Sequence, residues 1–159
     1  MSKKLSIIIA VLLVLTGIVA ALHLGSQKDV ACMVILCDDK EISVSFEELR
    51  QDAFSGELID GKGAVTFHEY TGILLRTLLE TKGIALTGAS KLTVTSADNF
   101  SAEFTAEEIL QTDNVYLAVT ADGKPIEGID PETEGVQAIV FGDPNSRRCV
   151  RFAQKISIK

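Results

Sequence analysis

The 159-residue sequence predicts an α+β domain of mostly short strands in mixed or antiparallel sheets, with three short helices, preceded by one N-terminal transmembrane helix. Two observations in the body of the chain lead to this class. Short runs rich in β-branched and aromatic residues are separated by turn signals such as Asp-Gly and Gly-Asp-Pro. Three runs with helical spacing or helix-capping residues lie between them. Short strands with interposed short helices are typical of α+β folds.

The N-terminal segment has the features of a membrane span. Lys3 and Lys4 precede an apolar run from residue 5 to residue 24. At about 1.5 Å per residue this run covers roughly 30 Å, the thickness of the bilayer's hydrocarbon core, whereas the apolar part of a secretory signal has about 7–15 residues. The length therefore favours an uncleaved anchor, and the preceding lysines predict an extracytoplasmic C-terminal domain. Secretion after cleavage near Ala21 remains the alternative.

The rest of the chain is expected to form one exported domain. We assign residues 1–28 to the anchor or signal segment and residues 29–159 to the domain, which is long enough to bury roughly two-thirds of its chain surface. The whole chain has a net charge of −7, and residues 1–28 carry three lysines and no acid, so the net charge of residues 29–159 is −10. An acidic domain of this kind argues against nucleic acid as a partner.

The first half of the domain is expected to begin with a hairpin of strands 32–37 and 41–46. Ser45 and Glu48 have capping-box spacing, which predicts a helix over 46–52. The segment 54–63 contains three glycines and is expected to be a loop or short hairpin.

A strand over 65–70 should follow, and Thr71-Gly72 should end it. Leucines at helical spacing then predict a buried helix over 73–82, with Gly83 as its stop signal.

The second half reads as a similar succession of short elements. Thr105 and Glu108 have capping-box spacing and predict a helix over 105–111. Turns are expected at 97–99, 122–123 and 142–146, and a surface loop at 128–135. The remaining strands are expected at 91–96, 100–104, 115–120, 136–141 and 150–158.

The candidate site is the sequence His68-Glu69-Tyr70 at the end of the third predicted strand. Functional side chains often lie where strands end, and this cluster offers hydrogen bonding and an imidazole that titrates near neutral pH. The alternative is structural: His68 caps nearby backbone and Tyr70 packs on the leucine-rich helix. The sequence has no phosphate-binding glycine loop, CxxC, HExxH or nucleophile elbow. His68 is the one histidine outside the apolar run, so we expect neither a metal nor catalytic residues.

Two further features concern the cysteines and the basic C-terminus. On one strand, Cys32 and Cys37 would lie about 16 Å apart, beyond disulfide reach. Any bridge should therefore involve Cys149, and otherwise all three cysteines are small buried hydrophobes. The last thirteen residues contain five basic residues and no acid. This patch is either a solvated strand face or a binding surface.

The order of these elements resembles the molybdopterin-binding domain of the sulfite-oxidase-like oxidoreductases over residues 30–159. The resemblance is carried by YTGILLRTLLETKGI, KLTVTSADNFSAEF, VYLAVTADGKPI, VQAIVFGD and RRCVRFAQKISI. It implies that fold, with a cleft facing the His68-Glu69-Tyr70 segment, Asp98, Asn99, Arg147 and Arg148. Paired arginines beside a histidine would suit an anion.

Several departures from the family pattern bear on function. The resemblance implies a cysteine thiolate as molybdenum ligand, but no cysteine occurs from residue 38 to residue 148. Glu134 stands where the family has histidine, Gln137 where it has arginine and Phe100 where it has tyrosine. We therefore expect a non-catalytic binding domain without cofactor that recognises a small anionic ligand or an envelope protein. The alternative is a molybdopterin-dependent oxidoreductase with an atypical site.

Overall fold

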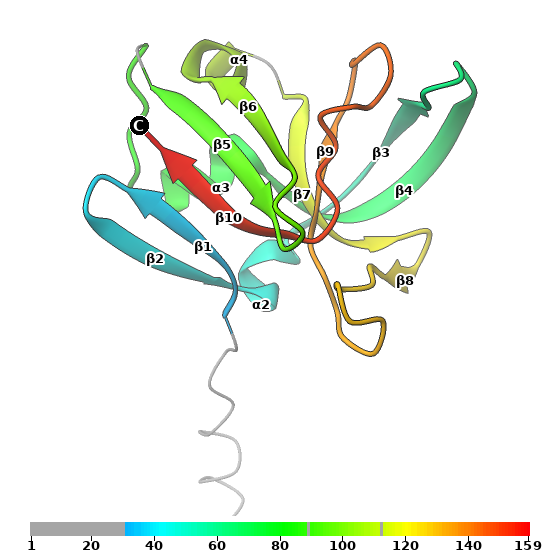
Figure 1. Cartoon of the computed structure of the whole chain (residues 1–159), viewed down its shortest axis with the longest axis horizontal. Coiled ribbons are helices and arrows are strands. Elements are labelled where there is room, and N and C mark those ends of the chain that lie inside the picture. Colours follow the sequence, from blue (N-terminus) through cyan, green and yellow to red (C-terminus); the bar gives the residue numbers. More distant parts are fainter. Residues whose placement is uncertain (1–30, 89, 112) are drawn as a thin grey trace, which may run out of the picture. The chain divides into compact units, whose positions relative to one another are not determined.

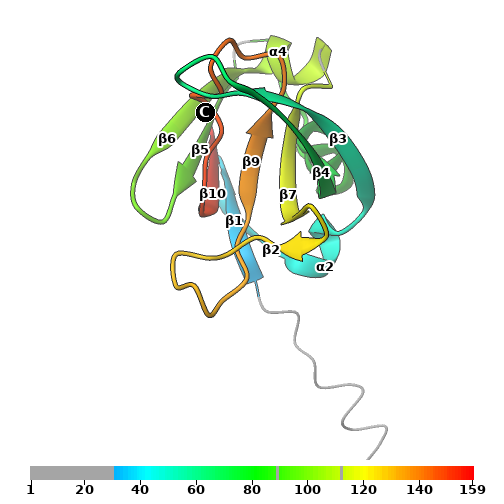
Figure 2. The same ribbon diagram turned by 90° about the vertical axis from the view of Figure 1, so that its right-hand side faces the viewer.

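The computed structural model describes residues 31–159 except residues 89 and 112, and it contains two sheets (Figures 1 and 2). The first sheet has the strand order β2-β1-β10-β5-β6. Its β1 and β10 are parallel, and its other pairs are antiparallel, so the sheet is mixed. Its strands are β1 (Ala31–Cys37), β2 (Lys40–Ser45), β5 (Lys91–Ser96), β6 (Ser101–Thr105) and β10 (Ala153–Ile158).

The second sheet is antiparallel and has the order β3-β4-β7-β8, with β9 also paired to β7. Its strands are β3 (Asp52–Ile59), β4 (Val65–Leu74), β7 (Val115–Ala121), β8 (Lys124–Pro125) and β9 (Gln137–Val140). Three short helices are described, α2 (Phe46–Leu49), α3 (Leu75–Thr81) and α4 (Ala106–Gln111). The predicted combination of short strands in mixed and antiparallel sheets with three short helices is therefore confirmed.

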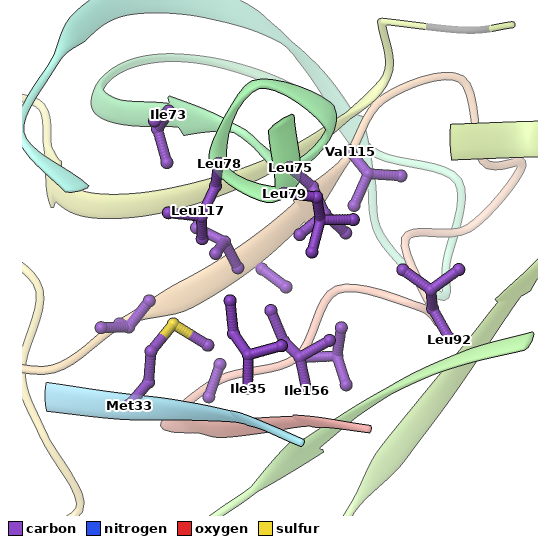
Figure 3. Packing of buried hydrophobic residues seen from close by; sticks show 14 of the residues in the cluster. Met33, Ile35, Ile73, Leu75, Leu78, Leu79, Leu92, Val115, Leu117 and Ile156 are labelled. Atoms are coloured by element: carbon purple, nitrogen blue, oxygen red, sulfur yellow. The ribbon is translucent and has the colours of Figure 1, made fainter. Parts of the chain in front are cut away.

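The hydrophobic core joins both sheets to α3 (Figure 3). Ile35 on β1 and Ile156 on β10 are fully buried and face Leu117 on β7. Helix α3 adds Leu75, Leu78 and Leu79, and these are also buried. Full burial of one such side chain stabilises a fold by about 1.5–3 kcal/mol, so the leucine spacing that predicted a core helix also provides much of the packing around β7.

The segment 54–63 was expected to be a loop or short hairpin. Its residues 54–59 instead form most of a regular strand, β3, and its residues 60–63 belong to the turn that leads to β4. β3 pairs with β4 from Asp52 to Ile59 in continuous register. Gly56 does not mark a turn here. A Cβ at Gly56 would lie 2.7 Å from a ring carbon of Phe141, so glycine provides room for that ring.

Three predicted boundaries are also corrected. Thr71-Gly72 does not end a strand, because β4 continues to Leu74 with an irregularity in its pairing to β7 at this point, and α3 begins only at Leu75. The first helix ends at Leu49 instead of 52. The last strand begins at Ala153 instead of 150, because Phe152 adopts a left-handed conformation with φ 54° in the preceding turn.

The predicted membrane span at residues 5–24 lies outside the described residues. Within the described part of the chain, no helix is long and apolar enough to cross a bilayer.

The predicted capping box of α2 is present and is extended by a lysine. The Ser45 backbone N–H donates to Glu48 Oε2 at 2.9 Å, and the Glu48 backbone N–H donates to Ser45 Oγ at 3.4 Å. Lys82 Nζ lies 2.5 Å from Glu48 Oε1. The hydrogen bonds from Lys82 and then from Ser45 lower the pKa of Glu48 from its usual 4.5.

We expect Glu48→Gln to reduce the free energy of unfolding by about 1 kcal/mol or less at pH 7, because this carboxylate is partly solvent-exposed. A depressed carboxyl pKa stabilises the fold above the unfolded pKa and loses that contribution as pH falls through the folded pKa. The difference between variant and wild type should therefore shrink below pH 4.5. Urea unfolding at pH 7 and about pH 3 measures this difference in unfolding free energy. Glu47→Gln, from the same helical turn, is the control. A difference that grows on acidification would contradict the assignment.

Candidate functional site

His68, Glu69 and Tyr70 lie in the middle of β4, between β3 and β7, rather than at a strand end. Successive side chains of a strand point to opposite faces. His68 and Tyr70 therefore share one face of the sheet, and Glu69 lies on the other. Tyr70 is buried, His68 is partly buried and Glu69 is exposed. The three residues thus serve two different surfaces.

His68 is held by Asp122 in the turn between β7 and β8. His68 Nδ1 lies 2.8 Å from Asp122 Oδ2, and the Glu69 backbone N–H donates to Asp122 Oδ1 at 3.1 Å. These two hydrogen bonds, from His68 first, lower the pKa of the Asp122 carboxyl. The Asp122 N–H in turn donates to the Glu69 carbonyl at 2.7 Å. The histidine and aspartate therefore fasten the middle of β4 to the end of β7.

Tyr70 belongs to an aromatic cluster on the same face as His68. The ring of Phe54 stacks on Tyr116 at 4.2 Å and on Tyr70 at 5.4 Å, measured between ring centroids, and Phe141 meets Tyr116 edge-on at 5.7 Å. Burial raises the pKa of Tyr70 to about 12, with further contributions from Cys149 and Asp122. The Tyr70 hydroxyl is therefore neutral at physiological pH.

A cavity of about 360 Å³ is formed by β3, β4 and the β7–β8 turn. Ser55, Glu69, Thr71 and Thr120 project from one face of these strands, as their cross-strand register requires. The lining contains hydroxyls and one carboxylate, but no cysteine, lysine or arginine. Its residues are Ala53, Phe54, Ser55, Glu69, Tyr70, Thr71, Thr120 and Gly123.

Asp98 and Asn99 lie in the turn between β5 and β6, in the sheet that does not contain β4. Asp98 accepts hydrogen bonds from Ser96 Oγ at 2.6 Å and from the Phe100 N–H at 3.1 Å, which lower its pKa. Asn99 has φ 69°. Both residues therefore shape their own turn.

Arg148 lies in the connection between β9 and β10 and binds two carboxylates. Its guanidinium donates to both carboxylate oxygens of Asp143 and to Glu108 on α4. It also lies over the ring of Phe104, 5.2 Å from the centroid. The hydrogen bonds that Arg148 donates to Asp143, followed by the bond to Glu108, raise the pKa of Arg148. Arg148 thus ties a loop to the fold, while neighbouring Arg147 is exposed.

The three cysteines are free and partly buried. The Cys32 thiol donates to the Val44 carbonyl at 3.4 Å, and burial raises its pKa to about 11. The Val140 N–H donates to the sulfur of Cys149 at 3.3 Å, and burial also raises the pKa of this thiol. Among the described residues, no group of three or more histidine, cysteine, aspartate or glutamate side chains is placed to hold a metal ion.

Sequence reasoning did not identify Asp122, Ser55, Thr71 or Thr120 as site residues. The Asp-Gly turn at 122–123 was predicted only as a chain reversal. Its contact with His68 depends on the pairing of β4 with β7, which joins segments separated by about fifty residues. The three hydroxyl residues have no recognisable motif. They meet because β4 pairs on one side with β7 and on the other with β3, which was not predicted as a strand of this length.

The comparison with known proteins gives both a family and a fold. The model of the oxidoreductase molybdopterin-binding domain matches residues 32–130, more than half of the chain. The fold is similar to that of the sulfane dehydrogenase SoxCD from Paracoccus pantotrophus, with a TM-score of 0.60 at 20% identity. This likeness covers 83% of the present chain and 39% of the SoxCD chain, so the present chain spans well under half of that protein's length.

The comparison with curated proteins gives no match. The structural likeness to SoxCD agrees with the predicted sulfite-oxidase-like fold, and the family match covers the segment from β1 to the loop after β8. The chain belongs to the oxidoreductase molybdopterin-binding domain family.

Proposed function

We propose that this chain is a non-catalytic binding domain of its family, which recognises a partner through the β3–β4–β7 cavity rather than through a thiolate-held molybdenum. The observation that carries the proposal is the cavity lining of Ser55, Glu69, Thr71 and Thr120, which offers hydroxyl donors and one negative charge. Such groups form hydrogen bonds with polar ligands and attract positive charge.

The residues present do not fit a molybdopterin cofactor. Molybdenum in this setting requires a soft thiolate, and the anionic pterin requires cationic or N–H donors. No cysteine, arginine or lysine lines the cavity. Cys32 and Cys149 lie outside the cavity lining, and burial raises the pKa of both thiols. Arg148, the strongest candidate for an anion contact, already binds Asp143 and Glu108.

A partner with positive charge fits the surface better than a small anion does. Glu69 is the one charged residue of the cavity lining, and no lysine or arginine accompanies it there. A carboxylate without a cationic neighbour in the lining repels an anionic ligand. Of the two partner classes that the sequence suggested, the present proposal therefore retains the envelope protein.

A molybdopterin-dependent oxidoreductase is the second candidate. The family match supports it better than it supports a non-catalytic role, because the family is described by oxidoreductase chemistry. This candidate requires a metal ligand other than a cavity thiolate. It also requires cationic groups that approach the cavity from outside its present lining.

Metal and pterin analysis of the full chain distinguishes the two candidates. The protein is purified from a host that makes the cofactor, beside a molybdenum enzyme loaded by the same host as control. We expect molybdenum and pterin fluorescence well below one equivalent per chain. Stoichiometric molybdenum with pterin would overturn the binding proposal and favour the oxidoreductase.

We further propose that residues 29–159 lie on the extracytoplasmic side of the cell membrane, anchored through residues 5–24. The support is the length of the apolar run and the preceding Lys3 and Lys4. External protease should digest the domain in intact spheroplasts. Protection of the domain in intact spheroplasts, or its release in soluble form, would contradict this placement.

A further inference from the structure

β3 is an edge strand, and only part of its outer backbone is occupied by contacts within the chain (Figure 2). The Asp60 N–H donates to the Ala64 carbonyl in the hairpin, so the backbone groups of Asp60 point toward the chain that leads into β4. The Ile59 N–H points away from β4 and donates to Ser146 Oγ at 3.2 Å. Because directions alternate along a strand, the N–H and C=O groups of Ser55 and Glu57 also point outward. Both residues are exposed.

Apart from the contact of Ser146 at Ile59, this edge lacks the sequence features that usually protect against strand addition. Sheet edges are normally blunted by lysine, proline or a bulge. The sequence DAFSGELI of β3 contains no lysine or proline, and its pairing with β4 is continuous. The β2 edge of the other sheet, in contrast, begins with Lys40 and has a register shift in its pairing with β1. β3 is therefore the better template for an added strand.

The side chains beside this edge combine apolar and acidic groups. Val65 and Phe67 on β4 are 54% and 61% exposed. Phe67 lies opposite Glu57, and Glu69 lies opposite Ser55, so these residues share one face of the hairpin with the cavity. No lysine or arginine of β3 or β4 is available to neutralise the two glutamates, because neither strand contains one.

The charge of the hairpin selects the class of strand that could be added. Residues 52–72 contain four acidic residues and one lysine. Pairing with a second copy of β3 would bring two such acidic hairpins together, and like charges in direct opposition destabilise strand pairs. An extended segment with alternating basic and apolar side chains would instead place its cations on the face of Glu57 and Glu69. Its apolar groups would then lie on the opposite face, beside the partly buried Phe54 and Leu58 of β3.

We propose that β3 accepts an extended basic peptide segment of a partner protein as an additional strand, with its basic side chains on the face of Glu57 and Glu69 and its apolar side chains on the face of Phe54 and Leu58. Backbone hydrogen bonds would supply affinity and the alternating side chains specificity, as in other cases of strand addition. The inference rests on the proposed binding function and names its class of partner.

The test measures fluorescence anisotropy of the full chain with a labelled heptapeptide of alternating lysine and valine. The same peptide with glutamate replacing lysine is the charge control, and a peptide of the same composition with its lysines grouped at one end is the pattern control. We expect binding of the alternating lysine peptide to be at least about tenfold tighter than that of either control, and to weaken with salt.

Two variants separate edge pairing from general charge attraction. Ser55→Pro removes an outward N–H without removing a bond to β4, because proline is tolerated at such edge positions. We expect it to weaken binding about tenfold or more, whereas Ser55→Ala, which keeps the backbone N–H and removes only the cavity hydroxyl, should weaken binding clearly less. Glu57→Gln with Glu69→Gln keeps the edge and should reduce affinity about fivefold. Circular dichroism and urea unfolding verify that each variant folds.

Absence of binding to the alternating lysine peptide, or equal binding of all three peptides, would overturn the inference. Unchanged affinity in folded Ser55→Pro or in the double glutamine variant would also overturn it. These outcomes concern the partner alone: a chain without molybdenum that ignores the peptide retains the proposed binding function. Stoichiometric cofactor would instead overturn that function, whatever the peptide result.

Discussion

Replacing Gly72 by alanine is expected to reduce the free energy of unfolding by about 3 kcal/mol or more. This value is at the upper end of the effects of overpacking an interior, which typically cost about 1–3 kcal/mol. A Cβ at Gly72 would press on the Leu117 carbonyl oxygen and lie 2.8 Å from Ala118 Cα. These are backbone atoms of β7, which cannot move aside as a flexible side chain can. Relief requires separation of β4 from β7 at the irregular point in their pairing.

Urea unfolding of Gly72→Ala beside Gly61→Ala measures this effect. Gly61 lies in the loop of the β3–β4 hairpin, and an added Cβ there meets nothing within 4 Å. The Gly61 variant should remain within about 0.5 kcal/mol of wild type. Equal stabilities of the two variants would contradict the close approach of β4 to β7.

Replacing Arg148 by methionine is expected to destabilise the fold by about 2 kcal/mol. Removal of one partner of a buried ion pair costs about 3–5 kcal/mol, and we discount this because 35% of the Arg148 side chain is exposed to solvent screening. The side chains of Asp143 and Glu108 are only 10% and 20% exposed. Both would lose a charged hydrogen-bond donor.

A double-mutant cycle with Asp143→Asn isolates the contribution of the Arg148 pair, because residues in direct contact show coupling that distant residues do not. Arg147→Met provides the matched control, since Arg147 is adjacent and exposed. A loss as large in Arg147→Met as in Arg148→Met would contradict the anchoring role of Arg148 and restore it as a candidate ligand contact.

Local patterns predicted the elements whose determinants lie within a few residues. The capping spacings of Ser45 with Glu48 and of Thr105 with Glu108 correctly placed the starts of α2 and α4. The apolar run of β1, the alternation in β2 and the strand-like runs of β5 and β6 on either side of a turn also predicted the two hairpins of the mixed sheet. In each case the stabilising contact is a short-range hydrogen bond or a pair of adjacent strands.

Predictions failed where a glycine serves a distant contact. Gly56 and Gly72 suggested a loop and a strand break, but each provides room for a group far along the chain, Phe141 and Leu117 respectively. A single sequence does not reveal which distant atom approaches a glycine. The strand assignments of 54–59 and 71–74 therefore required the tertiary structure.

The candidate site was also predicted only in part, because its contacts join residues far apart in the sequence. His68, Glu69 and Tyr70 were selected by chemistry alone, and the structure gives them different surroundings on two faces of β4. Arg148 was selected as an anion contact because paired arginines beside a histidine suit an anion. Its partners Asp143 and Glu108, five and forty positions away in the sequence, were not recognised as such. Pairing of charges through the fold was not predictable from spacing.

The central claim is that no thiolate of this domain is placed to hold a metal, and alkylation of the native full chain by iodoacetamide tests it most directly. Burial raises the pKa values of Cys32 and Cys149. We therefore expect both to react at least about tenfold more slowly at pH 7.5 than in the urea-unfolded chain, and faster as pH rises. Mass spectrometry of the labelled peptides gives the rates. Native Cys149 reacting faster than unfolded Cys149 at pH 7.5 would reveal a stabilised thiolate and contradict the account.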